Sequence, residues 1–262
     1  MHNTPEATDQ QLDLRRLHHA LTANKQAIYH LLEQPSPDLL QALLRNPALD
    51  EHHLLALLKQ RGLTSALFEV IQHYLGESSD SYQLAKALAR HPETPSHIAL
   101  ATLPRLYLFD LAELSRCNQA TPDQRMAAER LIIQRLPTQP LGNKLTLARQ
   151  GTAAIVEALL KEGQPQVVAV CLDNPRLKEG ALHQFLSSGA ASAETISQVA
   201  RHPTWQHRPN LQLAILKHPR TPLIWYTLWL PRLKRGAVKE LGHSPRLTSQ
   251  QRACIKQYLG EH

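Results

Sequence analysis

The sequence predicts an all-α fold arranged as a right-handed α-α superhelix, that is, a solenoid of short helix pairs. Three observations lead to this prediction. The apolar residues are mostly leucine, a polar corner motif recurs along the chain, and one stretch of the sequence occurs twice.

The apolar composition favours helices over sheet. The 262 residues include 47 Leu but 10 Ile and 7 Val, and aromatic residues make up 5%. Leu keeps its rotamer freedom in a helix, whereas the β-branched residues lose some of theirs. Ten Gly are too few for the turns of an all-β protein of this length. We therefore expect a core in which helices pack on helices.

A recurring corner motif punctuates the chain. A basic residue in a last helical turn complements the helix dipole, Asn or His can leave the helical conformation, and Pro prevents the helix from continuing. The pairs Thr94-Pro95 and Thr221-Pro222 read as an N-cap followed by proline at the first helical position. The corners are Arg45-Asn46-Pro47, Arg90-His91-Pro92, Asp173-Asn174-Pro175, Arg201-His202-Pro203 and Lys217-His218-Pro219.

Between these corners the apolar residues recur at helical spacing, as in Leu39, Leu40, Leu43 and Leu44. Helices this short must bury their apolar stripes on neighbours, and stacking in chain order gives a continuous core. Capping boxes at Thr121/Gln124 and Thr248/Gln251 mark two starts. In order, the expected helices are 9–33 (with a break near Asn24 as an alternative), 37–45, 50–59, 63–75, 81–90, 95–102, 106–116, 122–136, 143–149, 152–162, 165–172, 177–187, 192–201, 208–217, 222–229, 233–242 and 248–259.

An internal duplication supports a repeat architecture. Residues 87–132 align without a gap on residues 214–259, with 14 of 46 positions identical. A fixed period of self-similarity is typical of repeat proteins. We predict one domain over residues 1–262. The stretch 76–80 is either a hinge or subdomain boundary, or one long corner.

The corners resemble those of the leucine-rich repeat variant and HEAT-like families of bacterial α-solenoids. The resemblance rests on the L-x-R-[NH]-P pattern with a following Thr-Pro and covers residues 37 to 259. It implies a solenoid fold and an interaction scaffold. The name-giving leucine-rich repeat variant protein also carries an iron–sulfur cluster on cysteines near its N-terminus. This chain has no cysteine before Cys117, so the cluster is not carried over.

Charge is distributed unevenly along the chain. Residues 1–131 hold 12 Lys and Arg against 15 Asp and Glu, whereas residues 132–262 hold 17 against 7. Such asymmetry predicts an anionic partner for the C-terminal half.

The strongest candidate site combines two tryptophans with basic residues. Trp225 and Trp229 lie at i and i+4, so a helix would present them on one face. This set could bind nucleic acid by stacking and phosphate contacts, or serve a membrane surface or a partner helix. The tryptophans could instead belong to the core, because the aligned residues are Ile98 and Thr102. The candidate partner-binding residues are Arg208, Trp225, Trp229, Arg232, Lys234, Arg235 and Lys239.

Other chemistry finds little support. The adjacent pairs His18-His19 and His52-His53 point about 100° apart on a helix, and the corner histidines read as polar caps, so we expect no metal and no cofactor. No common catalytic motif appears, and we expect no enzyme. A minor alternative is a HEAT-like DNA glycosylase, in which Trp205, Trp225 and Trp229 would line a base pocket.

The functional prediction is a non-catalytic binding scaffold for an acidic protein partner, with nucleic-acid binding as the alternative. We expect a cytoplasmic protein, because the N-terminus is polar and the three cysteines match no disulfide or zinc spacing. No apolar run is long enough to span a bilayer. The sequence does not indicate an oligomeric state.

Overall fold

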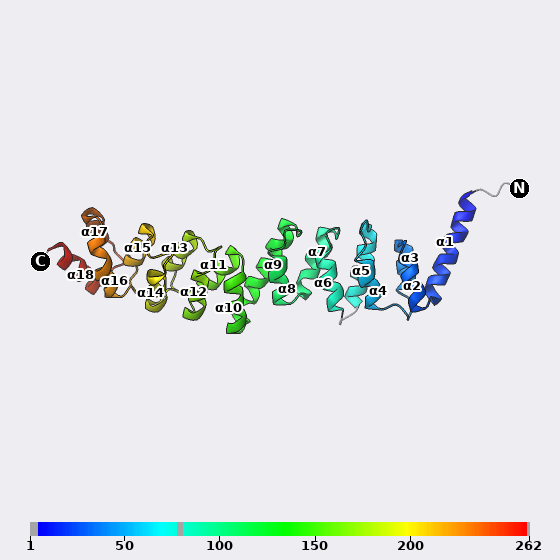
Figure 1. The fold of residues 1–262 in the computed structure, drawn as a ribbon, viewed down its shortest axis with the longest axis horizontal. Coiled ribbons are helices and arrows are strands. Elements are labelled where there is room, and N and C mark those ends of the chain that lie inside the picture. The colour runs from blue at the N-terminus through cyan, green and yellow to red at the C-terminus, as the bar shows by residue number, and fades with distance from the viewer. Residues whose placement is uncertain (1–4, 78–80, 261–262) are drawn as a thin grey trace. The chain divides into compact units, whose positions relative to one another are not determined.

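The computed structural model describes residues 5–77 and 81–260, and these residues form helices and connections without a strand (Figure 1). The predicted all-α class is therefore confirmed. The chain divides into two compact units, residues 1–131 and 132–262. Residues 78–80 of the stretch 76–80 lie outside the described residues. The single domain and the right-handed superhelix stay predictions.

The helices that begin in the first unit are short. The predicted range 9–33 is divided at Asn24, whose side chain caps the second helix by accepting a 2.9 Å hydrogen bond from the Ala27 backbone N–H. The elements are α1 (Pro5–Thr22), α2 (Lys25–Leu31), α3 (Pro37–Leu43), α4 (Glu51–Leu57), α5 (Ser65–Glu77), α6 (Tyr82–Arg90), α7 (Ser96–Thr102), the 3-10 helix η1 (Leu103–Arg105), α8 (Leu108–Leu114) and α9 (Pro122–Arg135).

The second unit repeats this pattern of short helices. Its elements are the 3-10 helix η2 (Leu136–Thr138), α10 (Leu141–Gln150), α11 (Ala153–Lys161), α12 (Pro165–Leu172), α13 (Glu179–Ser187), α14 (Ala193–Arg201), α15 (Pro209–Leu216), α16 (Leu223–Trp229), the 3-10 helix η3 (Leu230–Arg232), α17 (Arg235–Gly242) and α18 (Ser249–Leu259).

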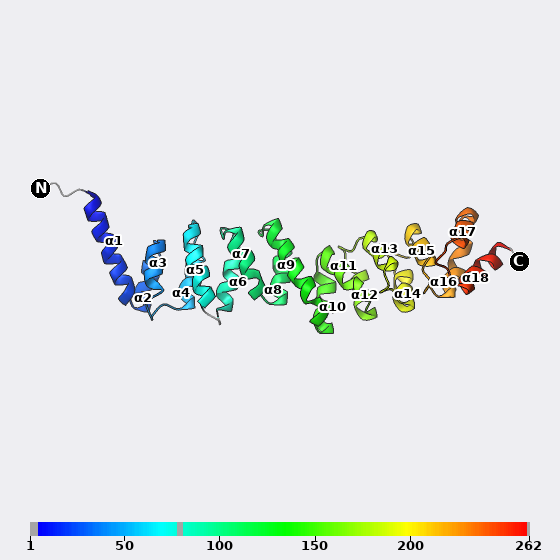
Figure 2. The same cartoon turned by 180° about the vertical axis from the view of Figure 1, so that it is seen from behind.

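Within each unit, helices pack on their neighbours in the chain and on the next helix but one. In the first unit α1, α3, α5 and α7 follow one another in one row, and α2, α4 and α6 in a second row. In the second unit α10, α12 and α14 form one row, and α11, α13 and α15 the other. Figures 1 and 2 show this alternation from both sides. Buried Leu, Ile, Val and Ala side chains fill the space between the rows.

Helix boundaries recur at a fixed spacing in the two units. The starts of α6, α7, α8 and α9 lie 127 positions before the starts of α15, α16, α17 and α18. The starts of α2, α3, α4 and α5 lie 128 positions before those of α11, α12, α13 and α14. The recurrence therefore extends beyond the duplicated stretch 87–132/214–259 that the sequence shows.

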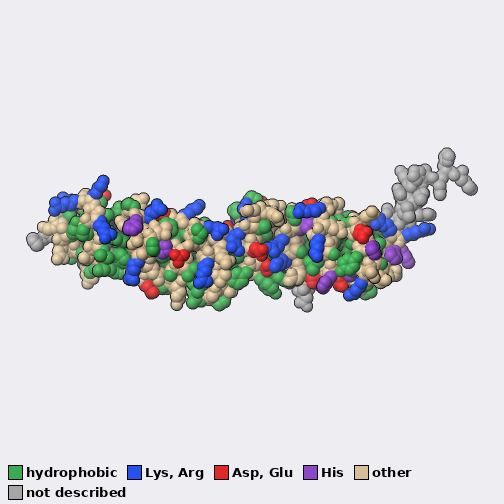
Figure 3. Space-filling view, viewed as in Figure 1, with side chains coloured by type: hydrophobic (Ala, Val, Ile, Leu, Met, Phe, Trp, Pro, Cys, Tyr) green, Lys and Arg blue, Asp and Glu red, His purple; other side chains and the backbone are tan. Residues whose placement is uncertain are grey.

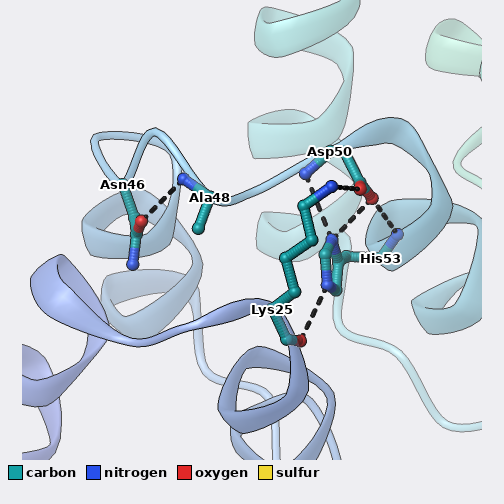
Figure 4. Close-up of polar contacts among 5 residues, drawn as sticks. All are labelled: Lys25, Asn46, Ala48, Asp50 and His53. Atoms are coloured by element: carbon teal, nitrogen blue, oxygen red, sulfur yellow. Dashed lines mark hydrogen bonds and ion pairs between the residues drawn. The ribbon is translucent and has the colours of Figure 1, made fainter.

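The corner residues hold successive helix pairs together. The side-chain oxygen of Asn46 accepts a 2.8 Å hydrogen bond from the Ala48 N–H (Figure 4). The Asn46 amide nitrogen donates to the carbonyls of Ala20 and Ala23 at 2.7 and 2.9 Å. Asn174 bonds in the same way, to the Arg176 N–H and to carbonyls 23 to 26 residues earlier. Each asparagine side chain thus joins its corner to the connection one helix pair earlier in the chain.

The Thr-Pro pairs do not start helices as predicted. Helices α7 and α16 have Pro95 and Pro222 at their N-caps, so these prolines precede the first helical residue. Thr94 and Thr221 are buried, and their hydroxyls donate to the carbonyls of Leu88 and Ile215, six residues earlier. These threonines therefore close the corner onto the preceding helix. Thr94 supplies a donor to a carbonyl in the last turn of α6, and Thr221 gives the Ile215 carbonyl a second donor besides the His218 N–H.

The predicted capping boxes are confirmed. Thr121 and Gln124 exchange hydrogen bonds of 2.9 and 3.3 Å between side chain and backbone, and Thr248 and Gln251 do the same before α18. Each box satisfies two backbone N–H groups that have no partner within the helix. The sequence signal was sufficient here because all the partners lie within one helical turn.

Candidate interaction surface

The basic residues of the candidate site lie on helix ends and connections of the second unit. Arg232 ends η3, Lys234 is the N-cap of α17, and Arg235 is the first residue of that helix. Lys239 follows Arg235 by four positions, so the two share one side of α17. Arg208 is set apart, as the N-cap of α15. All five side chains are exposed, and Figure 3 shows Lys and Arg over the C-terminal helices. We call these five residues the basic surface.

None of these five cations has an ion-pair partner among the described residues. Four cations elsewhere are neutralised by carboxylates among the described residues: Lys25 pairs with Asp50 at 3.0 Å, and Lys144 with Glu162 at 2.7 Å. Two further pairs, Lys86–Asp110 and Arg90–Glu113, lie in the first unit. Unpaired charges of one sign give a positive field that attracts an anionic partner.

The part of the first unit that aligns with the start of α17 has different side chains and a paired carboxylate. Asp110 accepts a hydrogen bond from the Tyr82 hydroxyl and pairs with Lys86 at 2.7 Å. Partial burial would raise the pKa of Asp110, but the hydrogen bonds from Lys86 and Tyr82 outweigh it and lower the pKa. The residue 127 positions after Asp110 is Ala237, so the second unit has no carboxylate at this point. The basic surface is therefore not required by the repeat itself.

The tryptophans belong to the core of the second unit. Trp225 and Trp229 are 7% and 4% exposed, with their ring centroids 5.1 Å apart. The Trp225 indole N–H donates to the Ser197 hydroxyl on α14 at 3.1 Å. Trp205 is also buried, and its N–H donates to the Leu172 carbonyl. Rings this deeply buried offer little face for stacking on a base, which favours the core interpretation of these residues.

Exposed apolar residues on α16 were missed in the sequence. Leu223, Ile224 and Leu228 are 41%, 56% and 46% exposed. The signal was present in the duplication, because the first copy carries Ser96 and His97 where the second has Leu223 and Ile224. An apolar residue that replaces a polar one at a surface position of a repeat is a candidate contact residue.

Two grooves occupy equivalent positions in the two units. The first, of about 540 Å³, lies between α3 and α5, and the second, of about 450 Å³, lies between α12 and α14. Six lining positions correspond at a spacing of 128 residues, and the side chains differ at five of them, since Leu44 and Leu172 are the same residue type. The first groove has Gln41, Leu44, Ala66, Glu69, Val70 and His73 at these positions, and the second has Ala169, Leu172, Glu194, Ser197, Gln198 and Arg201.

The corner histidines act as hydrogen-bonding caps. His91 Nδ1 accepts from the Glu93 N–H, and its Nε2 lies 3.1 Å from the Gln60 carbonyl. His202 and His218 accept from the second following N–H in the same way. Burial lowers the pKa of His218, and the nearby cations Arg220 and Arg246 lower it further. Among the described residues no group of three or more His, Cys, Asp or Glu side chains is placed to hold a metal.

His53 is held by the preceding helix pair. Its Nε2 lies 3.0 Å from the Lys25 carbonyl, and its Nδ1 lies 2.6 Å from an Asp50 carboxylate oxygen and 3.1 Å from the Asp50 N–H (Figure 4). Desolvation would raise the pKa of Asp50, but the hydrogen bond from Lys25 and the charge of His53 outweigh it and lower the pKa. His53 therefore has a structural role at this corner.

The cysteines are free thiols, and they differ in burial. Cys171 is buried, which raises its pKa to about 12. Cys117 and Cys254 are partly exposed, and partial burial raises the pKa of Cys254. Cys117 lies in the connection between α8 and α9, and Cys254 lies in the middle of α18.

Within the described part of the chain, no helix is both long enough and apolar enough to cross a bilayer. Comparisons of the sequence with protein-family models and with curated proteins, and of the fold with solved structures, gave no match.

Proposed function

We propose that this chain is a non-catalytic binding protein whose basic surface binds an acidic partner protein. We further propose that its helix pairs form an α-solenoid similar to the leucine-rich repeat variant and HEAT-like families. The proposed function rests mainly on one observation. Among the described residues, no carboxylate pairs with Arg208, Arg232, Lys234, Arg235 or Lys239.

The charge distribution favours a partner over a purely structural role. Uncompensated cations repel one another, so they do not stabilise the fold. The first unit has equivalent helix boundaries, and three of its cations, Lys25, Lys86 and Arg90, pair with carboxylates. An acidic protein segment would supply the missing carboxylates, and its association would be steered by the field of the basic surface.

The buried tryptophans favour protein over single-stranded nucleic acid. Sequence-tolerant binding of single strands uses exposed rings on which bases stack, and Trp225 and Trp229 are not available for this. A DNA or RNA duplex could still bind to the basic surface through its phosphates alone, so duplexes are also tested as ligands below. Free thiols fit a reducing compartment, and the proposal places the protein in the cytoplasm.

Charge reversal tests the proposal. We expect Arg232→Glu, Lys234→Glu and Arg235→Glu together to weaken the binding of a fluorescent glutamate-rich peptide by at least about tenfold at low salt, because each reversal replaces attraction by repulsion. Fluorescence anisotropy measures the affinity. The control combines Lys59→Glu, Arg61→Glu and Arg130→Glu, which are exposed in the first unit and change the net charge equally.

Two outcomes would contradict the proposal. Equal losses in the two variants would show that net charge alone governs binding, so the basic surface would have no special role. Binding of duplex DNA or RNA with a steep salt dependence, and no binding of the peptide, would establish the nucleic-acid alternative.

A further inference from the structure

Helix α16 and its extension η3 present a continuous exposed stripe. The exposed residues come in pairs four positions apart: Leu223 and Ile224, then Thr227 and Leu228, then Pro231 and Arg232. The residues between these pairs are buried in the core of the second unit, namely Trp225, Tyr226, Trp229 and Leu230. A spacing of four places the pairs along one side of the helix.

The stripe is not needed for folding. Helix α7 has the same length and the same position in its unit, and its buried residues are Ile98, Ala99 and Thr102. At the places of Leu223, Ile224 and Leu228 it has Ser96, His97 and Ala101, all exposed. The first copy thus forms this element with small or polar residues on the outside. The three large apolar side chains of α16 are exposed without a structural reason within the unit.

The chemistry of the stripe changes from one end to the other. Its first two turns are apolar except for Thr227, and its end is basic through Arg232, which Lys234 and Arg235 closely follow. The first carboxylate after it in the chain is Glu240, in the last turn of α17. A complementary ligand has apolar side chains at one end and carboxylates at the other.

We propose that this face docks a short amphipathic acidic helix from the partner protein, an inference that rests on the proposed function. Apolar side chains of that helix cover Leu223, Ile224 and Leu228, and its carboxylates meet Arg232, Lys234 and Arg235. Residues at i and i+4 form ridges that pack between the ridges of another helix. The helices of each unit likewise pack directly on one another.

Other occupants fit the stripe less well. A bilayer surface suits an apolar face with cations along both flanks, whereas here they follow the apolar turns at one end. The phosphate backbone of a nucleic acid, which would meet the cations, offers no apolar group to cover exposed Leu and Ile side chains. An extended peptide that adds a strand needs a sheet edge, and the described residues contain no strand.

A pair of synthetic peptides tests the inference. One, of about 18 residues, has Leu at helical spacing in one half and Glu on the same face in the other half. The second has the same composition in a scrambled order, so that its charge is equal and its amphipathic face is lost. We expect the wild-type protein to bind the amphipathic peptide at least about tenfold more tightly than the scrambled one. Isothermal titration calorimetry measures both affinities.

Replacing the exposed apolar residues of α16 by the aligned residues of α7 tests whether they cause the preference for the amphipathic peptide. Leu223→Ser, Ile224→His and Leu228→Ala together should reduce binding of the amphipathic peptide to the level of the scrambled peptide at pH 8, where the new histidine is neutral. Binding of the scrambled peptide should not change. The control replaces three exposed apolar residues elsewhere, with Leu21→Ser, Met126→Ala and Leu141→Ser, and should keep the preference.

The outcomes separate this inference from the proposed function. Equal binding of the two peptides, weakened by the charge reversals, would overturn the amphipathic helix and leave the acidic partner in place. Failure of both peptides to bind at low salt would overturn both proposals. Co-sedimentation with phosphatidylserine vesicles that depends on Leu223, Ile224 and Leu228, without a preference between the peptides, would make the occupant a membrane surface.

Discussion

At each of five corners, one polar side chain accepts the N–H group two residues later. Asn46 and Asn174 do this with a carboxamide oxygen, and His91, His202 and His218 with Nδ1. Both groups offer an acceptor and a donor on opposite sides of a small planar group, which lets one residue join two backbone segments. The mixture of Asn and His at this position follows from that shared geometry.

Removal of a corner amide should destabilise its unit strongly. Asn174 is buried, and Asn174→Ala would leave the Arg176 N–H and the Ala148 carbonyl without their partner. We expect a loss of about 2–3 kcal/mol in the free energy of unfolding, because unpaired buried backbone groups keep their desolvation penalty. Urea denaturation followed by tryptophan fluorescence measures it. The exposed Asn210→Ala on α15 should change stability by less than about 0.5 kcal/mol.

His218 should make stability depend on pH in the neutral range. Its pKa in the folded chain is lowered by burial and by Arg220 and Arg246, so the unfolded chain binds the proton more tightly. The stabilisation of the folded state by neutral His218 is therefore complete above about pH 6.5. It is lost as the pH falls from there towards the lowered pKa of His218 in the folded chain.

His218→Asn keeps the corner geometry and removes the titrating group. The loss of unfolding free energy between pH 7.5 and pH 5.5 should be smaller in this variant than in the wild type, by urea denaturation. An equal loss in both proteins would show that other groups cause the pH dependence.

At the level of elements, one side chain, Gln251, joins the N-terminal end of α18 to the corner that follows α15. The Gln251 amide nitrogen donates to the carbonyls of His218, Pro219 and Thr221 at 3.0–3.2 Å, while its oxygen accepts the Thr248 N–H. The capping box thus also fixes α18 to the corner between α15 and α16. Gln251 is therefore expected to contribute more than Thr248 to the stability of the fold.

We expect Thr248→Ala to cost about 1 kcal/mol, the usual loss for an N-cap hydroxyl. Gln251→Ala should cost more, because three corner carbonyls, two of them buried, lose a donor in addition to the cap. Thermal unfolding by circular dichroism ranks the two variants, and the exposed neighbour Ser249→Ala serves as control. Equal costs would mean that the bonds to the corner carbonyls contribute little.

At the scale of the whole molecule, each unit has its own buried core. The three tryptophans, Trp205, Trp225 and Trp229, all lie in the second unit, so fluorescence reports that unit alone. Circular dichroism at helical wavelengths reports both units. In a chain of stacked repeats, stability is close to a sum of local terms.

Urea unfolding should therefore give different midpoints for the two probes when one unit is weakened. We expect Asn46→Ala, in the first unit, to lower the midpoint seen by circular dichroism and to leave the fluorescence midpoint unchanged. Asn174→Ala should lower the fluorescence midpoint. A joint shift of both probes by Asn46→Ala would show that the units unfold as one cooperative block.

Much of the fold was predictable from short-range signals. The break at Asn24, the capping boxes and the all-helical class depend on residues within one or two turns of each other. The Thr-Pro pairs were misassigned because two local roles compete for a threonine before proline. Thr94 and Thr221 bond backwards to a helix already formed, and not forwards to the next one.

Residues close together in the chain are enough to predict the helical class, the break at Asn24 and the capping boxes, and charge counts alone show that the C-terminal half is basic. Those features follow from caps, prolines and charge counts that need no distant partner. Only the tertiary structure decided that Trp225 and Trp229 are buried while Leu223, Ile224 and Leu228 face outwards, and that the cations beside them lack carboxylates. Burial depends on which helices pack together, and α16 meets residues such as Ser197, 28 positions from Trp225. A helical pattern of apolar residues shows that a face exists, but its neighbours determine which side that face turns to.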